Sequence, residues 1–217
     1  VRASQWNKRL DAAFHNPTAR WVVAQLKRMG FELLPLGDPF LTREIRAVTK
    51  FRKRVYVPKG GIPLLSSKQL FQIDPIDRKG LARGAHTDDM DEIGLKTNLV
   101  MVTCSGTNGR VQIVPAYMQG WTASQDALRI EGASNEQAGF IYAWLASEYG
   151  QALVLRHQYG SVITHLDREM LGIIPVPLVT KHQRQAIATL VLKANRLRDE
   201  AWNLEQGALA QLRAILQ

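Results

Sequence analysis

Cysteine is almost missing from this chain of 217 residues, which contains Cys104 alone. A single cysteine excludes an internal disulfide and any zinc site built from several cysteines of the chain, and it fits a reducing compartment. Long apolar runs are also missing, since no stretch reaches the roughly 18 apolar residues that a membrane span needs. The mixed, charged residues 1–11 lack the pattern of a signal peptide. We therefore expect a cytoplasmic chain without a membrane partner.

Common enzyme motifs are missing as well. There is no Walker lysine loop, no HExxH zinc motif and no GxSxG nucleophile turn. Residues 38–40 (DPF) lack the second proline of the amino-methyltransferase motif, and no glycine-rich loop after a strand precedes them. The acidic run at residues 88–92 is interpreted as a solvated loop rather than a metal site. We expect no catalytic centre, no metal and no cofactor in this chain.

Positive charge is in excess, with 28 Lys and Arg residues against 19 Asp and Glu residues and a net charge of +9. Residues 1–60 hold 13 of the basic residues against 4 acidic ones, whereas residues 61–180 are slightly acidic. Such a distribution favours a polyanionic partner, either a nucleic acid or an anionic membrane surface. The apolar share of 46% is that of a normal globular chain, so a core can form.

Local signals predict an α/β fold with a mixed sheet and packed helices. Asn16 before Pro17 is typical of a helix N-terminus, and apolar residues at helical spacing up to Gly30 predict a helix over residues 17–29. Further helices are expected over residues 135–147 and 149–157. Strands are expected at residues 31–36, 51–57, 70–73 and 122–130, with a hairpin over residues 98–114 and a proline-bounded extended edge segment at residues 173–177.

Proline is missing after Thr180, and Gly207 is the only glycine there. Apolar residues recur at the 3–4 spacing of a coiled coil over about three heptads. A helix over residues 181–216 would be roughly 54 Å long, too long to pack wholly on a domain of this size. We expect a folded domain over residues 1–180 and a helical arm over residues 181–217 that packs on another helix. Its apolar seam comprises Ile187, Leu190, Ala194, Leu197, Ala201, Leu204 and Ala208.

A dense basic run is the first candidate binding site. Long charged side chains suit contacts with a phosphate backbone, and the neighbouring Tyr56 suits stacking or hydrogen bonding. A solvated charged surface is the alternative. The run comprises Arg43, Arg46, Lys50, Arg52, Lys53, Arg54 and Lys59.

Two polar, glycine-containing loops are candidates for contacts with DNA bases. Glycine lets the backbone approach a ligand closely, and hydroxyl, amide and guanidinium groups match the donors and acceptors of base edges. Solvated turns with a hydrogen-bonded surface histidine are the alternative. Gln125 is a weaker candidate, either for reading adenine or for tying two loops together. The loop residues are Ser105, Thr107, Asn108 and Arg110, then Tyr159, Ser161 and His165.

In their order and spacing, the motifs of the chain resemble one half of the DNA specificity subunit of type I restriction–modification systems. The matches run through nearly the whole sequence. They are residues 9–12 (RLDA) with Asn16-Pro17, 61–66 (GIPLLS), 102–111 (VTCSGTNGRV), 123–126 (ASQD), 147–151 (SEYGQ), 159–163 (YGSVI) and 174–178 (IPVPL) before the long helix.

The resemblance implies a domain that reads one half of a split DNA site and a helix that spaces two such domains and docks methyltransferase subunits. It implies no catalytic centre, because methylation and cleavage belong to partner subunits that use S-adenosylmethionine and ATP with Mg²⁺. The expected partners are double-stranded DNA, a methyltransferase subunit and a restriction subunit. Full specificity subunits carry two recognition domains and two helices, and this chain has one of each. A natural half-subunit or a fragment explains this, and a half-subunit is expected to form a homodimer through its helix.

Two other functions stay open at this stage. The chain is alternatively the recognition end of a fused methyltransferase–nuclease whose catalytic part lies outside it, which sequence upstream of Val1 would show. It is alternatively a basic coiled-coil adaptor without base-specific reading, which binding to random and selected DNA would distinguish.

Overall fold

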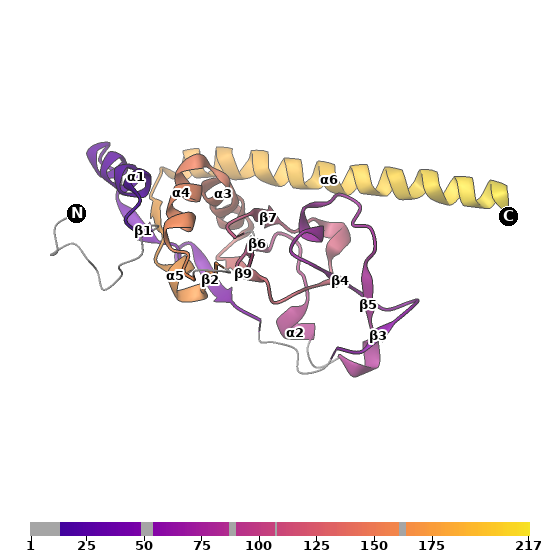
Figure 1. Ribbon diagram of the computed structural model, residues 1–217. Helices are drawn as coiled ribbons and strands as arrows, with labels where there is room; N and C mark the ends of the chain where they lie inside the picture. Colours follow the sequence, from indigo (N-terminus) through magenta and orange to yellow (C-terminus); the bar gives the residue numbers. More distant parts are fainter. Residues whose placement is uncertain (1–13, 49–53, 87–89, 107, 161–163) are drawn as a thin grey trace.

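A four-stranded antiparallel sheet lies at the centre of the chain in the computed structural model, which describes residues 14–48, 54–86, 90–106, 108–160 and 164–217. Its strand order is β2-β9-β6-β7 (Figure 1). The predicted hairpin is confirmed, since β6 and β7 pair from Val100 opposite Ile113. The strands are β2 (Thr42–Arg46), β6 (Val100–Thr103), β7 (Val111–Ile113) and β9 (Ala127–Gly132).

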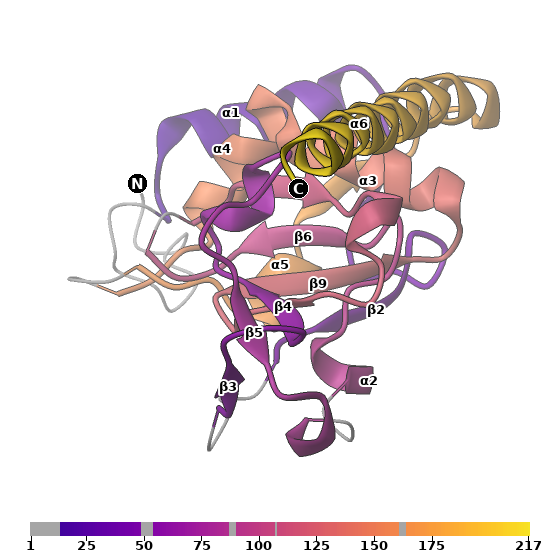
Figure 2. The same ribbon diagram turned by 90° about the vertical axis from the view of Figure 1, so that its right-hand side faces the viewer.

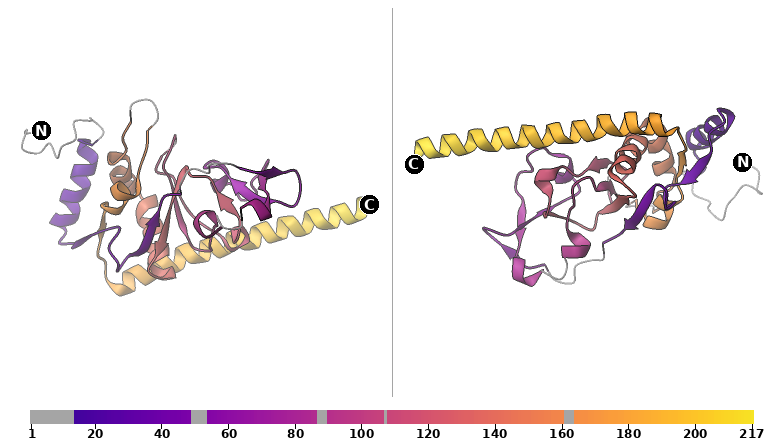
Figure 3. Two further views of the ribbon diagram at one scale, coloured as in Figure 1. Left: turned by 90° about the horizontal axis from the view of Figure 1, so that it is seen from below. Right: turned by 180° about the vertical axis from the view of Figure 1, so that it is seen from behind.

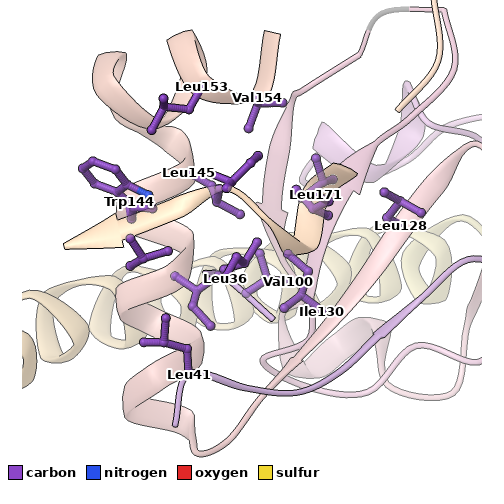
Figure 4. Close-up of a cluster of buried hydrophobic side chains, with 14 of the residues drawn as sticks. Leu36, Leu41, Val100, Leu128, Ile130, Trp144, Leu145, Leu153, Val154 and Leu171 are labelled. Carbon is purple, nitrogen blue, oxygen red and sulfur yellow. The ribbon is translucent and has the colours of Figure 1, made fainter. Parts of the chain in front are cut away.

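Both faces of this sheet are covered, which explains why β6 is apolar throughout instead of alternating. Val100 and Val102 point into the main core under the helices, while Met101 between them belongs to a second core. Figure 4 shows side chains of the sheet, such as Val100 and Ile130, gathered with those of the covering helices. Burial of this core is the principal stabilising contribution to the domain.

A second, mixed four-stranded sheet packs beside the first, in the order β3-β5-β4-β8. Its β4 and β8 are parallel, and its other pairs are antiparallel. The strands are β3 (Tyr56–Val57), β4 (Ile62–Leu65), β5 (Lys79–Leu81) and β8 (Thr122–Ala123). Short helical turns connect these parts: η2 (Gln69–Phe71), η3 (Arg83–Ala85), α2 (Met90–Ile93) and η4 (Ala116–Met118).

Two expected strands are wrong in detail. Residues 70–73 do not form a strand, because the chain turns into a 3₁₀ helix, η2, and hydrogen bonds of 2.9–3.3 Å between Ser66 and Gln69 hold the turn that leads into it. Residues 122–130 form two strands in different sheets rather than one. The chain leaves β4 after the Ser124 N–H bonds the carbonyl of Leu65, and it joins β6 where the Asp126 carbonyl accepts from Cys104.

Helices cover the main face of the central sheet. α1 (Pro17–Arg28) begins where the Asn16 side chain accepts from the Thr18 N–H at 2.9 Å, as expected. The other predicted helices are confirmed as α3 (Asn135–Ala146) and α4 (Glu148–Arg156), and a short α5 (Arg168–Gly172) follows. The predicted edge segment is confirmed as β10 (Pro175–Pro177), which pairs with β1 (Leu33–Pro35). The expected α/β class is therefore correct.

The long C-terminal helix is also confirmed as α6 (Lys181–Leu216), which begins with a capping box between Thr180 and Gln183. It packs on α3 at Gly139, where an added Cβ would lie 3.1 Å from the Ala188 Cα. The absent side chain lets the two helices approach closely. Figures 1 and 3 show α6 running along one side of the domain, from beside α3 past the second sheet region, with its last turns extending beyond the domain.

The face of α6 that contacts the domain differs from the predicted seam. Leu190, Leu197 and Leu204 are 70%, 51% and 75% exposed, whereas Ile187 at the start of the seam packs against the main core. The expected arm leaves the domain only beyond Gln206. Apolar residues of α6, including Ile187, Val191 and Leu192, pack against the main core. Polar contacts also hold the helix on the domain: Arg184–Glu136 at 2.8 Å, Asn195–Val114 carbonyl at 3.0 Å, and Tyr117 N–H–Asp199 at 2.9 Å.

Candidate nucleic-acid interface

Sheet topology brings several predicted segments to one end of the central sheet. β6 ends at Thr103, which pairs with Ala127 at the start of β9. Because antiparallel neighbours run in opposite directions, the turn after β6 and the segments leading into β7 and β9 meet at this end. β2 also runs toward it, since Arg46 pairs with Arg129. The polar turn after β6 and Gln125 thus converge at this end, where Arg54 contacts Gln125.

The second polar loop joins them there. Tyr159 and His165 exchange two backbone hydrogen bonds of 2.9 and 2.7 Å, and His165 forms a β-bridge with Ser105. The Leu166 N–H donates to the Cys104 carbonyl at 3.1 Å. The Tyr159 ring is 44% exposed and lies 6.0 Å from the His165 ring. Two loops about fifty residues apart in the sequence therefore form one surface, which we call the loop surface.

Asn108 was expected to contact a DNA base, but it lies buried between the two loops. Its side chain is only 9% exposed, and its amide donates to the Thr164 hydroxyl at 3.0 Å. The Thr164 hydroxyl lies 3.4 Å from the Gly106 carbonyl. In this arrangement Asn108 holds the two loops together and does not face solvent.

Arg110 is exposed, in contrast to the buried Asn108. Its guanidinium lies over the ring of Phe71, with 3.9 Å between Cζ and the ring centroid. Phe71 belongs to η2 of the second sheet region, so this contact crosses from one sheet to the other. The sequence did not predict this contact, because residues 70–73 were expected to form a strand.

Gln125 contacts Arg54 of the basic run. The Arg54 guanidinium donates a hydrogen bond to the Gln125 side-chain oxygen. This contact anchors Arg54 at the end of the central sheet and supports the loop-tying alternative for Gln125.

A groove of about 440 Å³ adjoins Arg54 on the second sheet region. Three basic and two acidic side chains line it, and the Lys79 ammonium lies 5.3 Å from the centroid of the Tyr56 ring. The sequence analysis did not single out Lys68 and Lys79, because both lie outside the dense basic run. The charged and aromatic lining residues are Arg54, Tyr56, Lys68, Lys79, Asp77 and Asp126.

The remaining predicted basic residues lie elsewhere. The Arg43 guanidinium pairs with Glu131 at 2.7 Å, at the far end of β2. Arg46 lies 3.2 Å from Glu44, and its side chain is only 18% exposed. Lys59 lines a separate hollow beside Trp121 and Trp202. Five predicted site residues fall outside the described residues: Lys50, Arg52, Lys53, Thr107 and Ser161.

Burial governs the acid–base properties of the loop surface. Burial, together with the nearby Asp126 carboxylate, raises the pKa of the Cys104 thiol to about 11. Desolvation and then Asp167 raise the pKa of the Tyr159 hydroxyl. Both groups are therefore protonated near neutral pH, and neither adds negative charge against a phosphate backbone.

Metal and membrane sites were sought across the described ranges. No group of three or more His, Cys, Asp and Glu side chains in them is arranged to hold a metal ion. None of their helices combines the length and the apolar character that crossing a bilayer requires.

Comparison with known proteins gives likeness in structure only. No family model matches the chain, and no curated protein matches its sequence. The S subunit of a type I restriction–modification system from M. genitalium superposes with a TM-score of 0.54 at 16% identity, over 79% of this chain and 41% of that chain. A chain of a type I R-M system, solved in a study of complex assembly and conformational transition, gives 0.55 at 12% identity, over 91% and 49%.

The type IIG restriction endonuclease BpuSI gives a TM-score of 0.58 at 11% identity, over 82% of this chain and 28% of that one. The chain thus spans less than half the length of each of these structures. At such low identities the likeness is one of fold. It confirms the resemblance expected from the motifs: the chain is built like one part of the S subunit of a type I restriction–modification system.

Proposed function

We propose that this chain reads one half of a split DNA site within a restriction–modification assembly and directs partner methyltransferase and restriction subunits to it. The observation that carries the proposal is the loop surface, where two polar loops meet beside Arg54 and the basic groove. The shared fold agrees with this role. Catalysis belongs to the partner subunits, with S-adenosylmethionine and ATP with Mg²⁺ as their cofactors.

Two kinds of DNA contact are assigned on this surface. Arg54, Lys68 and Lys79 line one groove and suit the phosphate backbone. Compact polar groups on the loops suit base edges. The reading residues are Arg110 and His165, with Thr107 and Ser161 retained from the sequence, and Lys50, Arg52 and Lys53 are retained as backbone contacts. Gln125 is left out because its side-chain oxygen accepts from Arg54. Arg43 and Arg46 are left out because carboxylates already pair with them.

The exposed seam of α6 is proposed as the assembly surface. Leu190, Leu197 and Leu204 form an apolar stripe that the domain leaves uncovered. The S subunit from M. genitalium is more than twice as long as the part that this chain covers. A second copy packed seam to seam would supply the other half of a recognition pair, in a two-fold arrangement. The same helix pair would present a docking site to a methyltransferase subunit.

A second candidate function is the recognition end of a fused methyltransferase–nuclease. The structural likeness to the type IIG endonuclease BpuSI favours it, because this chain covers 28% of that enzyme. DNA reading is the same in both cases, and only the location of catalysis differs. Coding sequence upstream of Val1 that continues into a catalytic domain would favour the fused enzyme.

A salt titration of DNA binding tests the assignment of backbone contacts. The chain is titrated with duplexes of random sequence at several salt concentrations. Lys68→Ala and Lys79→Ala should each reduce the slope of log affinity against log salt by about 1. Arg43→Ala is the matched control and should leave the slope unchanged, because Glu131 already pairs with this side chain. Equal losses in all three variants, or no binding at low salt, would contradict the proposed interface.

A further inference from the structure

The root of the Arg110 side chain is held rigidly. Its backbone N–H donates to the Thr103 hydroxyl at 3.0 Å, and its carbonyl accepts from the Thr103 N–H at 2.9 Å. The preceding Gly109 has a φ of +82°, and its carbonyl accepts from the Gln151 amide at 2.8 Å. A side chain at Gly109 would need strained backbone and would lie 3.0 Å from Val154. The direction in which Arg110 leaves the sheet is therefore set by its neighbours.

The guanidinium at the end of the Arg110 side chain is held by a cation–π contact. The guanidinium lies over the face of Phe71, 3.9 Å from the ring centroid. Phe71 is itself fixed, since it packs against the second core beside the fully buried Leu70. Within the described parts of the chain the Arg110 guanidinium makes no hydrogen bond or ion pair. Stacking uses the face of the guanidinium and leaves its in-plane N–H donors available.

A guanidinium with a fixed plane and available donors matches one base above the others. Guanine presents two acceptors side by side in the major groove, O6 and N7, and arginine bonds both at once. A phosphate offers two acceptors as well, but a phosphate contact carries no sequence information. The N–H donors of the Arg110 guanidinium form a planar fork. Because Phe71 holds this fork in place before DNA binds, less conformational entropy is lost on binding, which suits a group that selects among bases.

We propose that Arg110 reads a guanine in the target half-site and that Phe71 is the residue that positions it. The proposal rests on the proposed function, and it goes further by naming the base, the reading group and a positioning residue in the second sheet region. It also gives the packing of the two sheets a role in recognition. The distance from η2 to β7 determines where the fork lies.

The experiment enriches bound duplexes from a pool with a randomised centre, using the full chain. The variants are Arg110→Lys, which keeps the charge without the fork, and Phe71→Leu, which keeps an apolar side chain without the ring. Phe71→Tyr keeps the aromatic ring. Phe40→Leu is the matched control, since Phe40 stacks on Arg184 at the opposite end of the central sheet. Phe71→Met serves if Phe71→Leu lowers the melting temperature strongly.

The enriched motif of the parent chain should contain a G·C pair at which Arg110→Lys loses about tenfold in discrimination. Phe71→Leu should lose about threefold at that same pair and nowhere else. Phe71→Tyr and Phe40→Leu should keep the motif. Equal weakening on all duplexes would make Arg110 a phosphate contact and overturn the proposal.

An unchanged motif in Arg110→Lys would overturn the guanine assignment, and an unchanged motif in Phe71→Leu would overturn the positioning role. In both cases the proposed function stands, because the parent chain still selects a motif. Failure of the parent chain to enrich any motif would remove both the proposed function and this inference.

Discussion

Trp202 in α6 stacks face to face on Tyr117 in η4, with ring centroids 4.8 Å apart and ring planes 3° apart. Trp121 meets both rings edge-on, at 5.8 and 6.4 Å. The Tyr117 hydroxyl also donates to the Ile73 carbonyl at 2.6 Å. This aromatic cluster fastens the distal half of α6 to the second sheet region, far from its contact with α3. It therefore determines the direction in which the helix leaves the domain (Figure 2).

Replacing Trp202 by Ala should lower the free energy of unfolding by about 2 kcal/mol, because it removes one aromatic stack and its buried apolar area. Leu204→Ala, two residues further along, is the control and should change it by less than about 0.5 kcal/mol, since Leu204 is 75% exposed. Urea denaturation at low protein concentration measures both. Similar losses in the two variants would show that the stack does not anchor the helix.

The seam of α6 should govern assembly without governing folding. Leu197→Glu combined with Leu204→Glu should leave the melting temperature almost unchanged and abolish self-association and capture of a methyltransferase subunit. Asn203→Glu introduces one carboxylate on a third, solvent-facing side of the helix and should assemble normally. Light scattering and pull-down report the outcome. Deleting residues 181–217 is the poorer test, because it would uncover the core beneath Ala188.

Arg129 should be essential to stability. Its guanidinium is fully buried between the two sheets and donates to the carbonyls of Ala127, Ala123 and Ile93 at 2.9, 2.8 and 3.2 Å. Burial lowers its pKa to about 10, so it remains charged at neutral pH. Arg129→Ala removes the donor from three buried carbonyl oxygens and should lower the free energy of unfolding by about 3 kcal/mol. Arg43→Ala, an exposed arginine of the same sheet, should cost less than about 0.5 kcal/mol in the same denaturant titration.

Alkaline pH should destabilise the chain in part through Cys104. Burial raises the pKa of its thiol from an ordinary value of 9.0 to about 11. The folded state therefore favours the protonated thiol: this contribution is complete below pH 9.0 and disappears as the pH rises toward 11. Cys104→Ser should flatten the decline in melting temperature over that window. An identical decline in the variant would refute the assignment and point to other groups, such as Tyr117, whose pKa burial raises to about 12.

The purified chain should neither methylate nor cut DNA. The motifs for S-adenosylmethionine, ATP and zinc are missing from its sequence. The measurement is transfer of a radiolabelled methyl group, and nicking of a supercoiled plasmid, with and without an added methyltransferase subunit. Activity in the chain alone would show that it has a catalytic centre.

Local sequence signals were sufficient wherever a short segment specifies its own backbone. Asn16-Pro17 marks the start of α1, the SGTNG turn joins β6 to β7, and a proline-free apolar repeat makes α6. The charge distribution and the order of the motifs also predicted DNA recognition without a structure, because both are properties of the sequence itself. The shared fold with type I S subunits agrees with that interpretation.

Tertiary structure decided what depends on residues far apart in the chain. It placed Arg46 beside Glu44 and Asp91, buried Asn108 against Thr164, and set Phe71 under Arg110. It also determined which face of α6 packs on the domain, through apolar contacts such as Trp202 on Tyr117 and through polar contacts such as Asn195 to Val114 that hydrophobic periodicity does not register. Periodicity reports how a segment divides between core and solvent. Only the packing of the two sheets determines which side chains meet across them, and hence that the Arg110 guanidinium lies over Phe71.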